Sequence, residues 1–188
     1  MTMFRMLIMS AAASLLAGSA FAAPPSVHQV KGQAADGTRY YEDSIVIDAP
    51  AHALWLAFTD TGAYRKWASP VAAVDFRIGG AIEASYDPKG HLGDPQNIKN
   101  AFVAYIPDRL LVFRNVQAPD GLPGKDAYPK TIKTVEFEAL GPSQTKVTVS
   151  GVGFGAGADF DQLYGFFSRG DAGMLATLKT AMENPPPK

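Results

Sequence analysis

The chain contains no cysteine, which excludes disulfide bonds, thiol catalysis and lipid attachment at a cysteine. Its fold must therefore be stabilised by a hydrophobic core, and 188 residues are enough to form one. Charge is also scarce and balanced, since 17 basic and 18 acidic residues give a net charge of −1. No cluster of lysine or arginine is present, which argues against a protein that binds nucleic acid or an anionic membrane surface.

Long apolar runs are absent except at the N-terminus. Residues 6–21 are apolar or small, they follow the basic Arg5, and Ala20-Phe21-Ala22 has the small-x-small pattern of a signal-peptidase site. A membrane anchor is the weaker interpretation, because the run is short and no basic stop-transfer segment follows it. We expect cleavage after Ala22, which would change the net charge to −2 by removing Arg5. The product would be periplasmic or secreted, without integral membrane association.

The remaining sequence shows no internal repeat and no interdomain linker. Residues 23–38 are polar, and we expect them to form a flexible N-terminal segment. The end of the chain, residues 184–188, is rich in proline and is expected to be a disordered tail. A single domain over residues 39–183 is therefore predicted.

Most of that domain alternates apolar and polar residues, as half-buried antiparallel strands do. The pattern predicts seven strands, at 41–48, 74–78, 81–86, 97–106, 109–116, 131–140 and 145–154. After the first strand, helical spacing predicts two short helices that begin at Ala51 and carry Trp55 and Trp67. A long amphipathic helix is predicted over 159–182 despite its glycines, which could mark a kink or a close approach to the sheet.

This order of elements resembles the helix-grip fold of the START-like superfamily, also called SRPBCC, of the birch-pollen-allergen type. The segments that carry the resemblance are IDAPAHALWLAFTD, KWASPVAAVDFRIGG, IPDRLLVFR, TKVTVSGVGFG and DAGMLATLKTAM. They are most similar to the branch related to the activator of the heat-shock-protein ATPase. The resemblance implies an α+β fold in which a curved antiparallel sheet of about seven strands surrounds a long C-terminal helix.

The resemblance also implies a function class. Members of the superfamily commonly bind lipids, sterols, polyketides or other apolar molecules, and a minority are cyclases, hydrolases or oxygenase subunits. No shared catalytic set can be placed on this sequence. A co-chaperone role is not expected, because the leader directs the chain away from a cytosolic chaperone.

Strand parity and the aromatic residues give a candidate ligand site between the sheet and the long helix. The predicted ligand-binding residues are Trp67, Phe76, Ile78, Asn100, Phe102, Phe113, Asn115, Val135, Phe137, Tyr164 and Phe167. The alternative for each apolar member is that it simply fills the core. Lys133 shares the parity of this face, but its place near a strand end favours contact with water.

Catalytic motifs are weak. The three histidines, His28, His52 and His91, lack the spacing of metal ligands, and no G-x-S-x-G motif is present, so neither a metal nor a cofactor is predicted. Glu83 would be the best candidate for a general base if it pointed inward, near Asn100. The loops 87–96 and 118–129 could gate the cavity or could be tolerated insertions.

Two function classes follow. The first is a binding protein that holds a small apolar or amphipathic molecule, lipid-like or aromatic, and the alternative is an enzyme of the cyclase or hydrolase type in the same cavity. Two titratable groups that converge on the cavity within hydrogen-bond reach would favour the enzyme. The ligand and the oligomeric state are not predicted.

Overall fold

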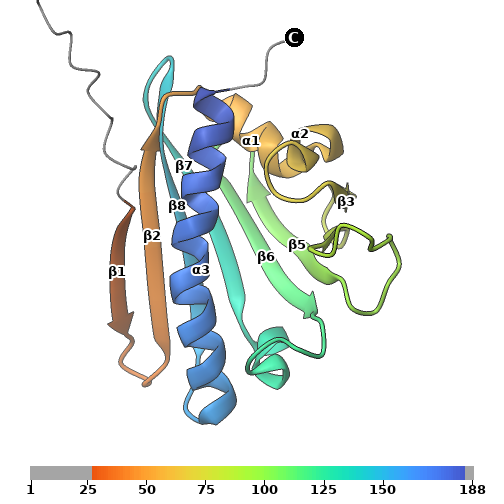
Figure 1. Cartoon of the computed structure of the whole chain (residues 1–188). Coiled ribbons are helices and arrows are strands. Elements are labelled where there is room, and N and C mark those ends of the chain that lie inside the picture. The colour runs from red at the N-terminus through yellow and green to blue at the C-terminus, as the bar shows by residue number, and fades with distance from the viewer. Residues whose placement is uncertain (1–26, 185–188) are drawn as a thin grey trace, which may run out of the picture.

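A computed structural model of the chain describes residues 27–184, so the predicted signal peptide and nearly all of the proline-rich tail lie outside the described residues. The described part is an α+β structure in which a long helix crosses the hollow face of an antiparallel sheet (Figure 1). Its elements are β1 (His28–Gln33), β2 (Arg39–Ile47), α1 (Ala51–Thr59), α2 (Thr61–Arg65), β3 (Val71–Val74), β4 (Ala81–Ser85), β5 (Ile98–Ile106), β6 (Leu110–Gln117), the 3-10 helix η1 (Lys125–Lys130), β7 (Ile132–Gly141), β8 (Gln144–Phe154) and α3 (Ala158–Glu183).

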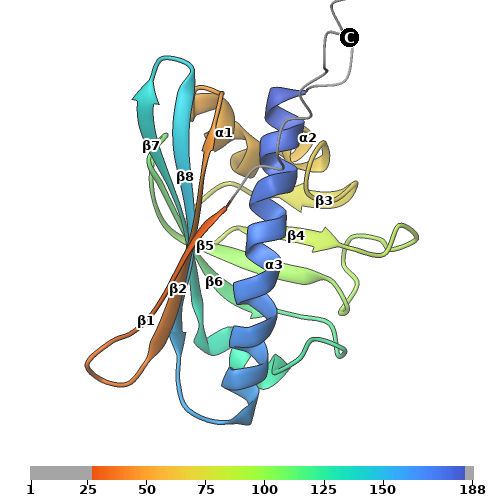
Figure 2. The same cartoon turned by 60° about the vertical axis from the view of Figure 1, so that its left-hand side comes forward.

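The sheet has the strand order β1-β2-β8-β7-β6-β5-β4-β3, and every neighbouring pair is antiparallel. Hairpins connect most neighbours, whereas β2 pairs with β8 from the other end of the domain. Figure 2 shows the sheet bending around α3, with α1 and α2 at the C-terminal end of that helix. The helix-grip architecture predicted from the sequence is therefore confirmed.

The sheet has one strand more than the seven predicted. The extra strand, β1, lies inside the segment that the sequence suggested was flexible, and it pairs along its whole length with β2. Five of its six residues are exposed, so it has no buried side that would produce an apolar alternation. Backbone pairing at the edge of the sheet orders this segment, and sequence periodicity cannot detect it.

A second correction concerns residues 74–78, which were predicted to be a strand. The strand β3 ends at Val74, and a turn follows in which Asp75 N donates to Ala81 O and Gly80 N donates to Arg77 O, each at 2.9 Å. Gly79 has a φ of +81°, a conformation that glycine adopts without strain. The alternation of Phe76 and Ile78 with polar residues is thus a feature of a turn.

The two short helices form close to the predicted positions, but α2 ends at Arg65, so Trp67 lies in the turn that follows it. Asp60 separates them, and its side chain accepts a hydrogen bond from Ala63 N at 2.7 Å to cap the start of α2. Trp55 and Trp67 do not pack against each other. Phe58 and Phe137 connect them: the Phe58 ring centroid lies 5.0 Å from that of Trp67 and 5.8 Å from that of Phe137, and Trp55 contacts Phe137.

The helix α3 carries its buried apolar residues at its two ends. Leu163 lies near the start and Leu175 and Leu178 lie near the end, while Ser168 and Asp171 are buried between them. The apolar contacts of the domain accordingly divide into two clusters, a large one under α1, α2 and Leu175, and a smaller one around Leu163. Among residues 27–184, no helix is both long and apolar enough to cross a membrane.

Candidate functional site

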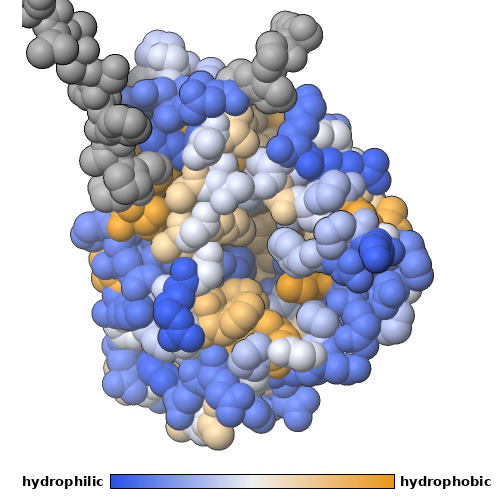
Figure 3. All heavy atoms as spheres, viewed as in Figure 1, coloured by the Kyte–Doolittle hydropathy of each residue, from blue (hydrophilic) through white to orange (hydrophobic). Residues whose placement is uncertain are grey.

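A cavity of about 380 Å³ lies between the sheet and the middle of α3. Figure 3 shows a hollow beside α3 in which hydrophobic atoms are visible. Its volume falls within the range of small-molecule sites, and such sites are mostly apolar with a few polar groups. The cavity is lined by Phe58, Tyr64, Trp67, Ala68, Ile82, Tyr86, Ile98, Asn100, Phe113, Tyr128, Lys133, Val135, Phe166, Phe167, Gly170, Asp171, Met174 and Thr177.

The mouth of the cavity carries exposed aromatic residues. Tyr86 follows β4 and is 64% exposed, and Phe166 on α3 is 42% exposed. The inner wall contains the buried tyrosines Tyr64 and Tyr128, and burial raises the pKa of each. Their hydroxyl groups are therefore uncharged at neutral pH.

The polar side of the cavity is built from one row of residues across the sheet. Tyr41 on β2 and Lys133 on β7 both face Gly151 of β8 in the register of the strands. A Cβ at Gly151 would lie only 2.4 Å from the Tyr41 ring, so glycine is required for Tyr41 to lie across β8. This arrangement lets both side chains reach Asp171, in the middle of α3.

Asp171 joins the helix to the sheet through charge-assisted contacts. Lys133 Nζ lies 2.8 Å from Oδ1 and 2.7 Å from Oδ2 of Asp171, and Tyr41 Oη donates to Oδ2 at 2.5 Å. Only 16% of the Lys133 side chain and 5% of the Asp171 side chain are exposed. Burial and the nearby Asp171 carboxylate raise the pKa of Tyr41, which keeps its proton on the donating hydroxyl.

A second carboxylate, Asp43 of β2, is fully buried next to this cluster. Its Oδ1 accepts a hydrogen bond from Gln29 Nε2 at 2.7 Å, whereas its Oδ2 has no partner within the described part of the chain. Burial, together with the Asp171 charge, raises the pKa of Asp43 even though Gln29 and nearby lysines act in the opposite direction.

A third polar contact lies on the other side of the cavity. Tyr128 Oη donates to Asn100 Oδ1 at 2.7 Å, which brings η1 against β5. The loop that carries Tyr128 is packed onto α3, because a Cβ at Gly124 would meet Asp159 O at 2.0 Å. The segment 118–129 thus contributes Tyr128 to the wall of the cavity.

Five of the eleven predicted ligand-binding residues line the cavity: Trp67, Asn100, Phe113, Val135 and Phe167. Four others do not line the cavity, although they lie on the predicted face of the sheet or on the long helix. Phe102 and Phe137 fill the core, and the buried Asn115 donates to Thr131 Oγ1 at 2.7 Å. Tyr164 packs in the smaller cluster, where its ring contacts Tyr41 and Phe154.

Phe76 and Ile78, the other two predicted residues, do not line the cavity, because both belong to the turn after β3. Phe76 packs against Trp55, Phe102 and Tyr105 away from the cavity, and Ile78 is 56% exposed.

Lys133, expected to meet water, instead lines the cavity, with Nζ also 4.5 Å from the centroid of the Phe167 ring. Sequence reasoning missed Asp171, Tyr128 and Met174. A polar residue on the apolar face of the long helix was the signal for Asp171.

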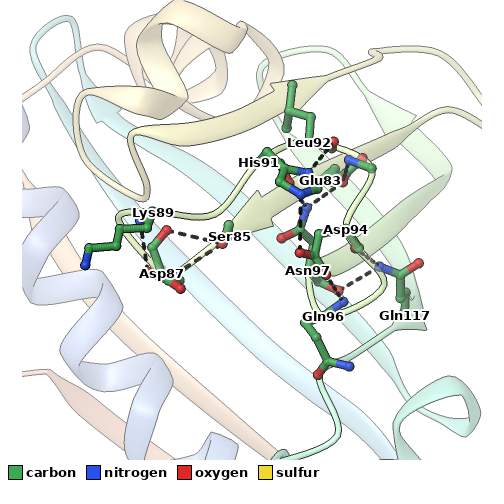
Figure 4. A network of polar contacts seen from close by, with 11 residues as sticks. Glu83, Ser85, Asp87, Lys89, His91, Leu92, Asp94, Gln96, Asn97 and Gln117 are labelled. Atoms are coloured by element: carbon green, nitrogen blue, oxygen red, sulfur yellow. Dashed lines mark hydrogen bonds and ion pairs between the residues drawn. The ribbon is translucent and has the colours of Figure 1, made fainter.

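Glu83 does not point into the cavity. Its neighbour Ile82 faces inward, and Glu83 Oε1 accepts hydrogen bonds from Gly93 N and Asn97 Nδ2, each at 2.6 Å (Figure 4). Burial tends to raise the pKa of Glu83, but these hydrogen bonds and Lys99 outweigh it and lower the pKa. Glu83 therefore ties down the loop 87–96. The condition for a role as a base, an inward-pointing side chain, is therefore not met.

The side chains of Asn97 and Gln117 complete the attachment of this loop. Asn97 Nδ2 donates to His91 O at 2.8 Å, and Gln117 Nε2 donates to Asp94 O at 3.0 Å (Figure 4). His91 itself is exposed, with Nε2 3.7 Å from Asp94, and it does not line the cavity. Within residues 27–184, no three His, Asp or Glu side chains converge on a metal-sized site.

An antiparallel sheet that grips a long C-terminal helix and leaves a cavity beneath it defines a protein of the START-like class. The model of the family described as activator of Hsp90 ATPase homolog 1-like protein matches residues 48–183, and the chain belongs to this family. Among curated proteins, no relative matches at a significant level.

Solved structures show the same fold at low sequence identity. The Aha1 dimer from Colwellia psychrerythraea aligns with a TM-score of 0.61 at 17% identity, over 78% of this chain and 97% of that one. CalU16 from Micromonospora echinospora aligns with a TM-score of 0.57 at 17% identity, over 87% and 86%. The Hsp90 activator PFC0360w from Plasmodium falciparum aligns with a TM-score of 0.54 at 17% identity, over 76% and 92%.

Proposed function

We propose that this protein is an exported small-molecule-binding protein that holds an apolar or amphipathic ligand in the cavity beneath α3. The observation that carries the proposal is the cavity itself, which aromatic side chains line and which contains few polar groups. The predicted leader supports export to the periplasm or the medium. Activation of a chaperone, the activity printed for the Plasmodium relative, is a weaker proposal for a chain with such a leader.

A second candidate is an enzyme of the cyclase or hydrolase type. Lys133 and Asp171 favour it, because they are two titratable groups that meet at the cavity wall. Asp171 accepts hydrogen bonds from Lys133 and Tyr41, so a substrate proton would have to compete with both donors for this carboxylate. Binding therefore remains the first proposal. Asp171-dependent hydrolysis of 2-naphthyl acetate would reverse this order.

The binding function is tested with N-phenyl-1-naphthylamine, an uncharged probe whose fluorescence increases in apolar surroundings. We expect the purified protein to bind the probe and Gly170→Leu to weaken binding, because Gly170 lines the cavity and a side chain there meets open space. Gly173→Leu is the matched control, since Gly173 is an exposed position of the same helix outside the cavity lining. Absence of binding, or equal loss in both variants, would contradict the proposal.

A further inference from the structure

We propose that the cavity selects an uncharged ligand with a hydrogen-bond-accepting oxygen, such as a ketone, ester or hydroxyl, and discriminates against carboxylates. This inference rests on the proposed binding function and narrows its ligand class. It depends on two features of the cavity wall, namely donors without a described protein partner and the charge balance.

The donors come from two strands of the sheet, β7 and β5, which β6 separates. Lys133 Nζ has three N–H groups, and Asp171 is its hydrogen-bond partner among residues 27–184. Asn100 uses its Oδ1 to accept from Tyr128, which leaves its Nδ2 amide group without a described protein partner. Both residues line the cavity, so a ligand oxygen can accept a hydrogen bond from either one.

The charge balance disfavours an anion. The ammonium group of Lys133 is already neutralised by Asp171, and the second buried carboxylate, Asp43, stands beside them. Burial, with a contribution from the Asp171 charge, raises the pKa of Asp43, in keeping with a region that disfavours a further negative charge. Lys31 and Arg39 lie over the ring of Tyr164, which is not part of the cavity lining.

The oxygens of Asp171 and Asn100 already hold donors of the protein itself. Asp171 accepts from Lys133 and Tyr41, and Asn100 Oδ1 accepts from Tyr128. A ligand that offers only donors would leave the Lys133 and Asn100 donors unpaired in an apolar site, which carries a desolvation cost. A neutral acceptor satisfies these donors without adding charge.

The test compares three probes of similar shape by displacement of N-phenyl-1-naphthylamine: 2-acetonaphthone, 2-ethylnaphthalene and 2-naphthoate. We expect the ketone to bind at least about tenfold more tightly than either the hydrocarbon or the carboxylate, because its oxygen can accept a hydrogen bond from a charged donor. Equal affinity for the ketone and the hydrocarbon, or tighter binding of 2-naphthoate, would overturn the inference while leaving the binding function intact. If N-phenyl-1-naphthylamine itself does not bind, the proposed function fails instead.

Two variants connect the preference to the residues. Lys133→Met should reduce the preference for the ketone over the hydrocarbon, whereas Lys146→Met should not, because Lys146 pairs with Glu138 outside the cavity lining. Asp171→Asn should improve 2-naphthoate binding about tenfold relative to the ketone, since it leaves the Lys133 charge unbalanced. A purely structural role for Asp171 predicts no such gain. The comparison of probes on the unmodified protein stands even if a variant fails to fold.

Discussion

At the scale of single residues, the unusual feature is a charged pair in a domain that otherwise depends on apolar packing. Burying two charges is costly, and the attraction between them offsets that cost only when the geometry is good. Lys133 and Asp171 meet this condition with contacts of 2.7 and 2.8 Å and a third contact from Tyr41. The pair attaches the middle of α3 to β7 and forms the polar side of the cavity.

Replacing one partner should therefore lower the stability of the fold. We expect Asp171→Leu to lower the free energy of unfolding by about 3–5 kcal/mol, because Lys133 keeps a largely buried charge without a counter-ion. The control is Asp161→Leu, which removes an exposed pair with Arg39 and should cost at most about 1 kcal/mol. Urea unfolding measures both. A cost for Asp171→Leu no larger than that of the control would show that the pair does not hold the helix.

Asp43 should make stability depend on pH. Its pKa is raised in the folded protein above the unfolded value of about 3.9, so the folded state binds the proton more tightly. The stabilisation from this proton is complete below the unfolded pKa and is lost as the pH rises through the folded pKa. We therefore expect Asp43→Asn to gain stability relative to the unmodified protein between acidic and neutral pH.

The measurement is urea unfolding of both proteins from pH 3.5 to pH 7. The difference in unfolding free energy should increase across the acidic range and then become constant. Asp48→Asn, in which an exposed carboxylate of the same chain segment is replaced, is the control for the loss of a carboxylate as such. A flat difference for Asp43→Asn would mean that its carboxylate is not perturbed by its burial.

At the scale of elements, strands and helices with one buried side were predictable from periodicity. The strands β2 and β8 and the helix α3 have regular apolar faces, and they form at the expected residues. The strand β1 could not be found in this way because it is held by backbone hydrogen bonds at an exposed edge. The turn after β3 was predicted to be a strand because Phe76 and Ile78 alternate with polar residues, as the residues of a half-buried strand do.

The candidate site was predictable only as a face of the sheet. Parity identified Asn100, Phe113 and Val135, but the same parity also contains Phe102 and Phe137, which fill the core. Which member meets the cavity depends on how far α3 stands from each strand, and that is a tertiary property. The helical glycines illustrate the same limit, since added methyl groups at Gly170 and Gly173 meet open space and no close approach to the sheet.

One element-level prediction concerns the row of residues across β2, β8 and β7. Gly151→Ala should destabilise the protein by about 1–3 kcal/mol, because its Cβ collides with Tyr41 and forces that ring away from Asp171. Gly141→Ala, at the end of β7, meets nothing within 4 Å and should be close to neutral. In thermal unfolding, the cost of Gly151→Ala should shrink when Tyr41 is replaced by leucine. An undiminished cost would point to the strand itself.

At the scale of the whole molecule, the cavity is bounded by members of both apolar clusters. The large cluster contributes Trp67 and its neighbours near α1 and α2, and the smaller one contributes Tyr128 of η1 and the adjoining Phe167 of α3. Facing the cavity, α3 also presents Gly170, which has no side chain, and Asp171, which is polar. The same arrangement explains how a domain without disulfides can remain stable around a hollow centre, since packing is concentrated at both ends.

Export is the last prediction, and it concerns the chain as a whole. When the full-length chain is produced in a bacterium, we expect the periplasmic fraction to contain a protein whose intact mass corresponds to a start at Ala23. Cleavage there would leave β1 and its pairing with β2 untouched, because β1 begins at His28. Ala22→Asp should block processing, since the peptidase accepts small residues at that position. Recovery of the uncleaved chain in the cytoplasm from the unmodified gene would refute export, and a cytosolic role would then have to be considered for the same cavity.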